Sequence, residues 1–371
     1  MNKKTIWGIV GVIVVIVIIA IFTSRSGPGS AVPAQKPTIK IGFIAPLTGN
    51  ASYLGEGVKN AAQLALADLQ KKNTKYNYQV VFEDDAFSPA KTATAANKLI
   101  SIDGVDAIAT VASAAGSAAN PIAESNRVVH VGIASDPNIA KGTYNFIDWT
   151  PPAQEVKLSL QEAQKKGIKK IAIFGQKISG ITAVFDELKK QLPGTGIQIV
   201  AEDISNFGDK DFRTAIQKAQ AANPDYFLFC MFSPELEIIV KQIRDAGIKT
   251  PMTAIESFEL SDHPELFNGL WYVNAADPTP AFASEYQAAY GKGPTVATPN
   301  AYDIVGLVAQ AAESYQGSGK PSTTDIANAL TQIKGYNGAL GNDISIGPDH
   351  IVVTNAVVRI MENGKPVTVQ P

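Results

Sequence analysis

From residue 38 to residue 255 the chain alternates short apolar segments with amphipathic ones, and this alternation limits the fold more than any other feature. Runs of strand length are followed by segments whose apolar residues recur at helical spacing, as they do between residues 58 and 69. Strands that alternate with helices form parallel sheets with helices on both faces. We expect strands at 38–47, 78–85, 105–111 and 128–133, and helices at 55–73, 88–101 and 114–126, the last interrupted near Pro121.

The same pattern then restarts, which predicts a second lobe similar to the first. We expect helices at 153–167, 181–194, 211–223 and 234–247, and strands at 169–175, 197–204, 225–232 and 250–255. Three further helices are expected within 281–290, 300–315 and 324–333. A closing pair of strands should form a hairpin that turns at 362–365, where asparagine and glycine favour a tight turn.

Composition argues against several classes of function. The net charge of −2 gives no indication of a nucleic-acid partner. The three histidines are far apart and lack metal-ligand spacing, so we expect no metal site and no cofactor. The single cysteine, Cys230, lies in an apolar run, which predicts a buried thiol and excludes a disulfide within the chain.

The N-terminus resembles a membrane anchor. Lys3 and Lys4 precede an uncharged apolar run from Ile6 to Phe22, 17 residues long, which as a helix spans roughly 26 Å. We interpret residues 1–22 as an uncleaved signal-anchor with the body outside the cytoplasm, the alternative being cleavage near 32–34. Residues 23–37, rich in Gly, Ser, Pro and Ala, are expected to be a flexible linker.

Small side chains fill residues 110–120, between an expected strand and an expected helix. Ligands of doubly wound sheets bind beyond the carboxyl ends of the strands, so these residues lie where a ligand would approach. A catalytic serine in a nucleophile elbow would need glycine two positions earlier, and Val111 stands there before Ser113. No phosphate-binding glycine pattern follows the first strand either. We therefore expect that the protein is not an enzyme.

Three segments together resemble a known family. Residues 39–70, 81–100 and 104–124, including PLTG at 46–49, EDD at 83–85 and SPAK at 88–91, are similar to the leucine/isoleucine/valine-binding proteins of ABC importers, and so is AYDIV at 301–305. The resemblance implies an α/β fold of the type I periplasmic binding protein class, with two doubly wound parallel-sheet lobes joined by a three-strand hinge. It implies lobe 1 at 38–148 and 277–337, and lobe 2 at 149–276 and 338–371.

The resemblance also implies where an amino acid would bind. Ser113 and, in the next loop, Ala134 and Ser135 would hold the ligand carboxylate, while Glu256 of the second lobe would accept the ammonium. Phe232 would lie over the ligand, and Tyr53 stands beside Leu54, where the family often has a tyrosine. Another family tyrosine is replaced here by Ile178. Without the resemblance, each of these residues has a purely structural alternative. Ser113 could simply cap its helix, Glu256 could be a solvated loop acid, and Phe232 could be a core residue.

The sequence therefore predicts a membrane-tethered, monomeric solute-binding protein that captures an amino acid or close analogue for the permease of an ABC importer. The alternative is a sensing or regulatory receptor of the same fold that acts on an envelope partner without transport. The sequence does not specify the side chain of the ligand, and the family also includes receptors for amides, urea and aromatic acids.

Overall fold

The computed structural model describes residues 36–49 and 51–369 of the 371-residue chain. The expected anchor at 1–22 and nearly all of the expected linker at 23–37 lie outside these residues. Within the described ranges no helix is both long and apolar enough to cross a bilayer. The body of the chain begins at Thr38.

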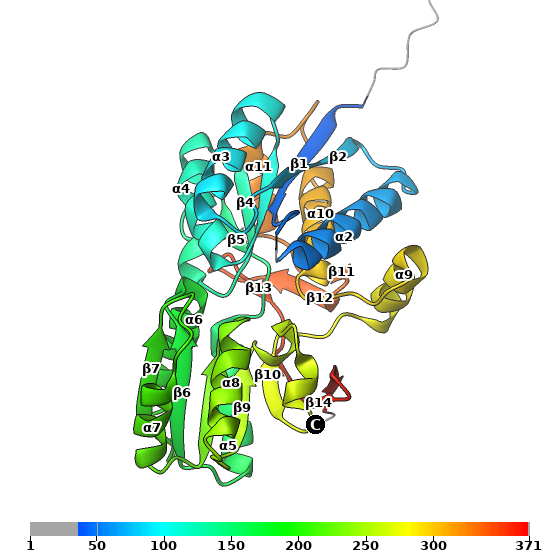
Figure 1. Cartoon of the computed structure of the whole chain (residues 1–371). Coiled ribbons are helices and arrows are strands. Elements are labelled where there is room, and N and C mark those ends of the chain that lie inside the picture. The colour runs from blue at the N-terminus through cyan, green and yellow to red at the C-terminus, as the bar shows by residue number, and fades with distance from the viewer. Residues whose placement is uncertain (1–35, 50, 370–371) are drawn as a thin grey trace, which may run out of the picture. The chain divides into compact units, whose positions relative to one another are not determined.

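A five-stranded parallel sheet forms the centre of lobe 1 (Figure 1). Its order is β2-β1-β3-β4-β5, as the strand-helix alternation predicts. Residues Ile39, Ile41 and Phe43 alternate along β1 and are fully buried on one face, while Ile44 belongs to the core on the other face. The strands are β1 (Thr38–Ala45), β2 (Asn77–Asp84), β3 (Ala107–Val111), β4 (Val129–Ile133) and β5 (Asn145–Ile147).

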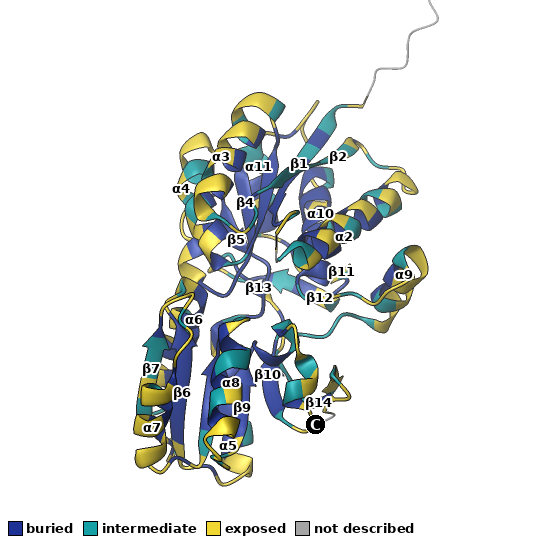
Figure 2. Cartoon of the chain, in the orientation of Figure 1, coloured by how far each residue is buried: buried dark blue, intermediate teal, exposed yellow. Residues whose placement is uncertain are grey.

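Helices cover both faces of this sheet. One face packs on α3 (Pro89–Lys98) and α4 (Ser113–Asn126). The other packs on α2 (Ser52–Gln70), α10 (Thr298–Glu313) and α11 (Thr323–Leu330), and α9 (Pro280–Tyr290) packs outside them on α2 and α10. Figure 2 shows the inner strands buried between helices whose outer sides are exposed, while the edge strand β2 is only partly buried.

Helix α4 differs from the expectation in one respect, because it runs unbroken through Pro121. Proline removes one backbone donor from a helix interior. The loss is tolerated here because Ala115, Ala119 and Ala123, spaced four residues apart, are buried on one face of the helix. Packing of that face outweighs the local penalty.

Lobe 2 contains a seven-stranded sheet with the order β15-β14-β10-β9-β8-β6-β7. The five strands β6 to β10 run parallel to one another. Strand β14 is antiparallel to β10, and β15 is antiparallel to β14. The expected hairpin is confirmed, and Asn363 and Gly364 both have positive φ, as its tight turn requires. The strands are β6 (Lys170–Gln176), β7 (Gln198–Ser205), β8 (Tyr226–Cys230), β9 (Met252–Ile255), β10 (Trp271–Asn274), β14 (Val357–Glu362) and β15 (Lys365–Thr368).

Two pairs of helices sandwich this second sheet. The pair α5 (Pro152–Lys165) and α6 (Ser179–Gln191) packs in one core. The pair α7 (Arg213–Ala221) and α8 (Glu235–Asp245) packs in the other. Cys230 is a free, buried thiol at the end of β8, as predicted.

Three segments cross between the lobes, and one crossing lies later than expected. The first two follow Ile147 and Asn274, but residues 338–353, which we assigned to lobe 2, pack in the core of lobe 1 through Ile344, Ile346 and Ile351. They belong to a small antiparallel sheet of β11 (Tyr336–Gly338), β12 (Gly341–Ile346) and β13 (Val352–Val353). The third crossing is therefore at 354–356.

The three crossings are bonded to one another at Thr150. Its hydroxyl lies 2.7 Å from that of Thr354 in the third crossing and accepts a hydrogen bond from the backbone N–H of Ala276 in the second, at 3.2 Å. A single buried side chain in the first crossing thus contacts both of the others.

Candidate functional site

Ser113 is the first residue of α4, directly after the carboxyl end of β3. Its hydroxyl is nearly buried and accepts a hydrogen bond from the backbone N–H of Asp136 at 3.3 Å. The N-terminus of a helix offers free N–H groups and a partial positive charge, both of which favour an anion. Ser113 is therefore placed where a carboxylate would be stabilised.

Glu256 of lobe 2 is linked directly to lobe 1. Its Oε1 accepts one hydrogen bond from the hydroxyl of Ser135, at 2.7 Å, and another from the indole Nε1 of Trp149, at 2.8 Å. Ser135 follows β4 in lobe 1, and Trp149 lies in the first crossing. Glu256 as a whole residue is 7% exposed, so its carboxylate is stabilised by these two donors more than by water.

The backbone is strained in both lobes, next to Ser113 and at Glu256. Ala112, immediately before Ser113, has φ of 75°, and Glu256 itself has φ of 61°. Positive φ costs free energy for any residue with a Cβ and persists only where the surroundings enforce it. The strain fixes the direction in which the two functional side chains point.

A second buried carboxyl group lies beside the first. Glu155, in the first turn of α5, is fully buried, and neither of its carboxyl oxygens has a hydrogen-bond partner among the described residues. Burial raises its pKa well above the usual range, and the neighbouring charge of Glu256 raises it further, while Arg359 opposes the shift. The pair thus favours a state in which Glu155 keeps its proton.

The lobes also approach closely at the start of α6. A Cβ built on Gly180 would lie 2.6 Å from Oγ of Ser113 and 3.5 Å from Cβ of Ser135. The first distance is below any normal contact, so only glycine permits this approach. Ser113, Ser135, Gly180 and Glu256 therefore meet at one point between the lobes.

The other expected site residues have different surroundings. Ala134 is buried next to Ser135, whereas Phe232 is half-buried, packs on the α5–α6 core and donates its backbone N–H to Gln176. Asp136, next to Ser135, accepts hydrogen bonds from the backbone and side chain of Asn138. Its carboxylate caps a turn within lobe 1.

A cavity of about 420 Å³ opens between the lobes next to this meeting point. Of the six residues proposed from the sequence, only Tyr53 lines it. Trp149 also lines it, and because its indole N–H bonds Glu256, one side chain separates the cavity from that carboxylate. A volume of this size is typical of small-molecule sites.

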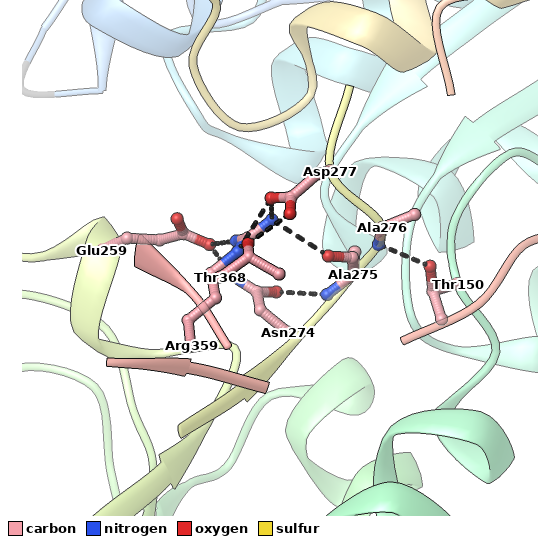
Figure 3. A network of polar contacts seen from close by, with 8 residues as sticks. All are labelled: Thr150, Glu259, Asn274, Ala275, Ala276, Asp277, Arg359 and Thr368. Carbon is pink, nitrogen blue, oxygen red and sulfur yellow. Dashed lines mark hydrogen bonds and ion pairs between the residues drawn. The ribbon is translucent and has the colours of Figure 1, made fainter. Parts of the chain in front are cut away.

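One wall of the cavity carries a charged network (Figure 3). Arg359 of β14 pairs with Glu259 and with Asp277, the latter through Nε at 3.1 Å and Nη2 at 2.5 Å. Thr368 donates to Asp277, and Asn274 donates to Glu259. The network ties the hairpin of β14 and β15 to the second crossing.

Sequence reasoning did not find Glu155, Gly180 or Trp149. An acid in the first turn of a helix usually interacts with the helix dipole in water, so nothing marked Glu155 as buried. Gly180 follows a strand end in the second series, at the same kind of position as Ser113, and that correspondence could have identified it. Trp149 follows the carboxyl end of β5, the last strand of the parallel sheet of lobe 1.

Comparisons with known proteins agree with this architecture. Residues 38–365 match the sequence model of a family described as periplasmic binding protein. The Leu/Ile/Val-binding protein BraC3 of Rhizobium johnstonii is 26% identical over 324 residues, which cover 83% of this chain and 88% of that protein. A Leu/Ile/Val-binding protein homologue of Brucella melitensis is 28% identical over 335 residues, covering 86% and 89%.

Two solved structures are similar throughout the body. A leucine-binding protein from Thermotoga maritima superposes with a TM-score of 0.80 at 25% identity, covering 90% of this chain and 98% of that one. A branched-chain amino acid substrate-binding protein from Streptococcus pneumoniae, solved with isoleucine, gives 0.78 at 25% identity, covering 90% and 100%. The body of this chain therefore shares its fold with both proteins.

Proposed function

The chain belongs to the periplasmic binding protein family, among the Leu/Ile/Val-binding proteins, and from that premise we propose that it binds an amino acid or close analogue between its lobes. Its relatives are solute-binding proteins and not enzymes. The observation that carries the proposal is the meeting of Ser113, Ser135 and Glu256 between the lobes.

The head group of an amino acid has two opposite charges, and the site offers a partner for each. The carboxylate would bind at Ser113, where the hydroxyl and the N-terminal N–H groups of α4 donate. The ammonium would bind at Glu256, whose charge already attracts two donors to one oxygen. A charge-assisted bond between an ammonium and a nearly buried carboxylate is stronger than the neutral hydrogen bond from Ser135.

Binding of both charges would couple the ligand to closure. Ser113 belongs to lobe 1 and Glu256 to lobe 2, so a ligand that contacts both stabilises only the arrangement in which the lobes meet. A ligand shifts such an equilibrium by its differential affinity for the two states. The three crossings, bonded at Thr150, would act as the hinge.

The bound ligand would then be delivered to the permease of an ABC importer. Several solved relatives are described as ABC transporter solute-binding proteins, which supports this step. The expected signal-anchor at 1–22, outside the described residues, would tether the body to the outer side of the membrane through residues 23–37.

A thermal-shift screen tests the proposal. The purified full-length chain would be heated with each amino acid, with amino-acid amides, with urea and with aromatic acids. A ligand that binds only the native state raises the midpoint of unfolding by an amount that grows with its concentration. We expect such a rise for at least one α-amino acid, and no rise with any amino acid would contradict the proposal.

A further inference from the structure

The cavity beside the head-group site is larger than a branched-chain ligand needs, and its lining, which is mostly apolar, also carries four charged residues. An isobutyl or isopropyl side chain has three or four carbons and would leave most of about 420 Å³ unfilled. Poorly filled apolar space forfeits dispersion contacts, so it gives little affinity for such a ligand. The cavity therefore suits a longer side chain.

The charge of the lining is negative. Three carboxylates line the cavity, those of Glu259, Asp262 and Asp277, against a single cation, Arg359. Arg359 is committed to Glu259 and Asp277 through ion pairs on both sides of its guanidinium (Figure 3). No ion pair reaches Asp262 among the residues that the structure describes, so its carboxylate is available to a ligand.

Asp262 and Tyr53 of α2, which belong to opposite lobes, line the same cavity, and both are exposed. The pKa of Tyr53 is raised by partial desolvation and further by the charges of Asp262 and Glu237, both in lobe 2. Trp149 contributes a second aromatic side chain to the lining. Carboxylates together with aromatic rings are the combination that recognises organic cations.

Glu256 lies at one end of this arrangement. Trp149 both lines the cavity and bonds Glu256 at 2.8 Å, so this one indole lies between the proposed ammonium position and the cavity. A ligand side chain that passes the indole would meet Tyr53 and Asp262 in the cavity.

We propose that the ligand is an α-amino acid whose side chain ends in a second cation, as in lysine, ornithine or arginine, with the distal cation held by Asp262 beside Tyr53 and Trp149. This inference rests on the proposed function, since it places the α-ammonium at Glu256. It adds a specificity that the names of the relatives do not carry, because those relatives are described as binding leucine, isoleucine and valine.

Titration calorimetry with matched ligands tests the inference. The full-length chain in mild detergent is titrated with lysine and with norleucine, which has the same straight carbon chain without the terminal ammonium, and likewise with ornithine and norvaline. We expect each cationic amino acid to bind at least tenfold more tightly than its neutral partner, and the difference to shrink as salt is added.

Two substitutions locate the cation. Asp262→Asn keeps the size of the side chain and removes its charge, so lysine should bind about tenfold more weakly while norleucine is unaffected. Asp245→Asn, at an exposed aspartate of the same lobe that pairs with Lys241, is the matched control and should change neither affinity.

Each other outcome has a definite meaning. Tighter binding of leucine or norleucine than of lysine overturns the inference and leaves the proposed function standing. Wild-type affinity for lysine in Asp262→Asn overturns it as well. Absence of binding by every amino acid would instead contradict the proposed function itself.

Discussion

Ser135 of lobe 1 donates its hydroxyl to Glu256 of lobe 2 across 2.7 Å, and this bond joins the two lobes at the proposed ligand site. Both residues are nearly buried, so the bond exists only while the lobes are in contact. It places a single charged oxygen where an ammonium group could join or replace the hydroxyl.

Gly180→Ala should weaken ligand binding without weakening the fold. Alanine is the better helix former, so α6 itself loses nothing. Its Cβ would lie 2.6 Å from Oγ of Ser113, which must move or hold the lobes apart. We expect a loss of affinity of at least about tenfold by calorimetry, with an unchanged or higher midpoint of unfolding for the ligand-free chain.

The Ser113→Ala background provides a control for Gly180→Ala. There the clashing oxygen is absent, and the two remaining neighbours, the Cβ atoms of residue 113 and of Ser135, are at ordinary distances of 3.4 Å and 3.5 Å. Gly180→Ala should therefore cost much less affinity in that background than in the wild type. Equal losses in both backgrounds would show that the two residues do not meet.

Ser113→Ala alone should reduce affinity by an order of magnitude or more, because it removes a donor from the ligand carboxylate. Ser117→Ala, at an exposed position of the same helix, is the matched control and should bind like the wild type. Wild-type affinity in Ser113→Ala would exclude this residue from the site.

Glu155→Gln should make the protein less sensitive to pH. Burial and the charge of Glu256 raise the pKa of Glu155, so the native state keeps this proton to a higher pH than the unfolded chain does. Native stability therefore falls as pH rises from about 4.3, the ordinary pKa of glutamate, towards the raised value, and stays lower above it. Glutamine carries no charge to bury, and the two carboxyl oxygens of Glu155 accept no hydrogen bond that the substitution would remove.

Denaturant unfolding at two pH values checks this prediction. We expect Glu155→Gln to match the wild type near pH 4 and to exceed it by about 1–3 kcal/mol at pH 8, the cost of a buried unpaired polar group. Glu162→Gln, on the outer side of the same helix beside Lys165 and Lys166, should show no such difference. An equal effect of Glu155→Gln at both pH values would refute the assignment of the raised pKa.

Membrane fractionation tests the tether. The full-length chain should stay in the membrane pellet after a high-salt wash and should need detergent for release, since an apolar helix is held by the hydrocarbon and not by charge. A chain that begins at residue 36 should be released without detergent, because every described core residue lies beyond that point. Release of the full-length chain by salt alone would refute the anchor.

The sequence predicted the layers of the fold well because its signals were periodic. Alternating strand and helix patterns specified both parallel sheets, and Asn363 with Gly364 specified the final turn. The third crossing was predicted wrongly because the apolar pattern of Ile344, Ile346 and Ile351 shows that these residues are buried but not in which lobe.

The site was harder to predict than the fold, since its geometry depends on residues that are distant in the sequence. Ser135 and Glu256 are 121 positions apart, and their contact requires both lobes to be folded and closed. The close approach at Gly180 and the burial of Glu155 likewise arise only from tertiary packing. The resemblance to a family identified Ser113, Ser135 and Glu256, whereas local pattern alone left each with an ordinary structural interpretation.

The central claim is that Glu256 holds the ammonium of an amino acid between the lobes, and titration calorimetry of Glu256→Gln tests it most directly. The wild type, Glu256→Gln and the exposed control Glu265→Gln would be titrated with the amino acid found by the thermal-shift screen. We predict one ligand per chain for the wild type and the control, and an affinity at least about tenfold weaker for Glu256→Gln. Equal affinity in all three proteins would contradict the account.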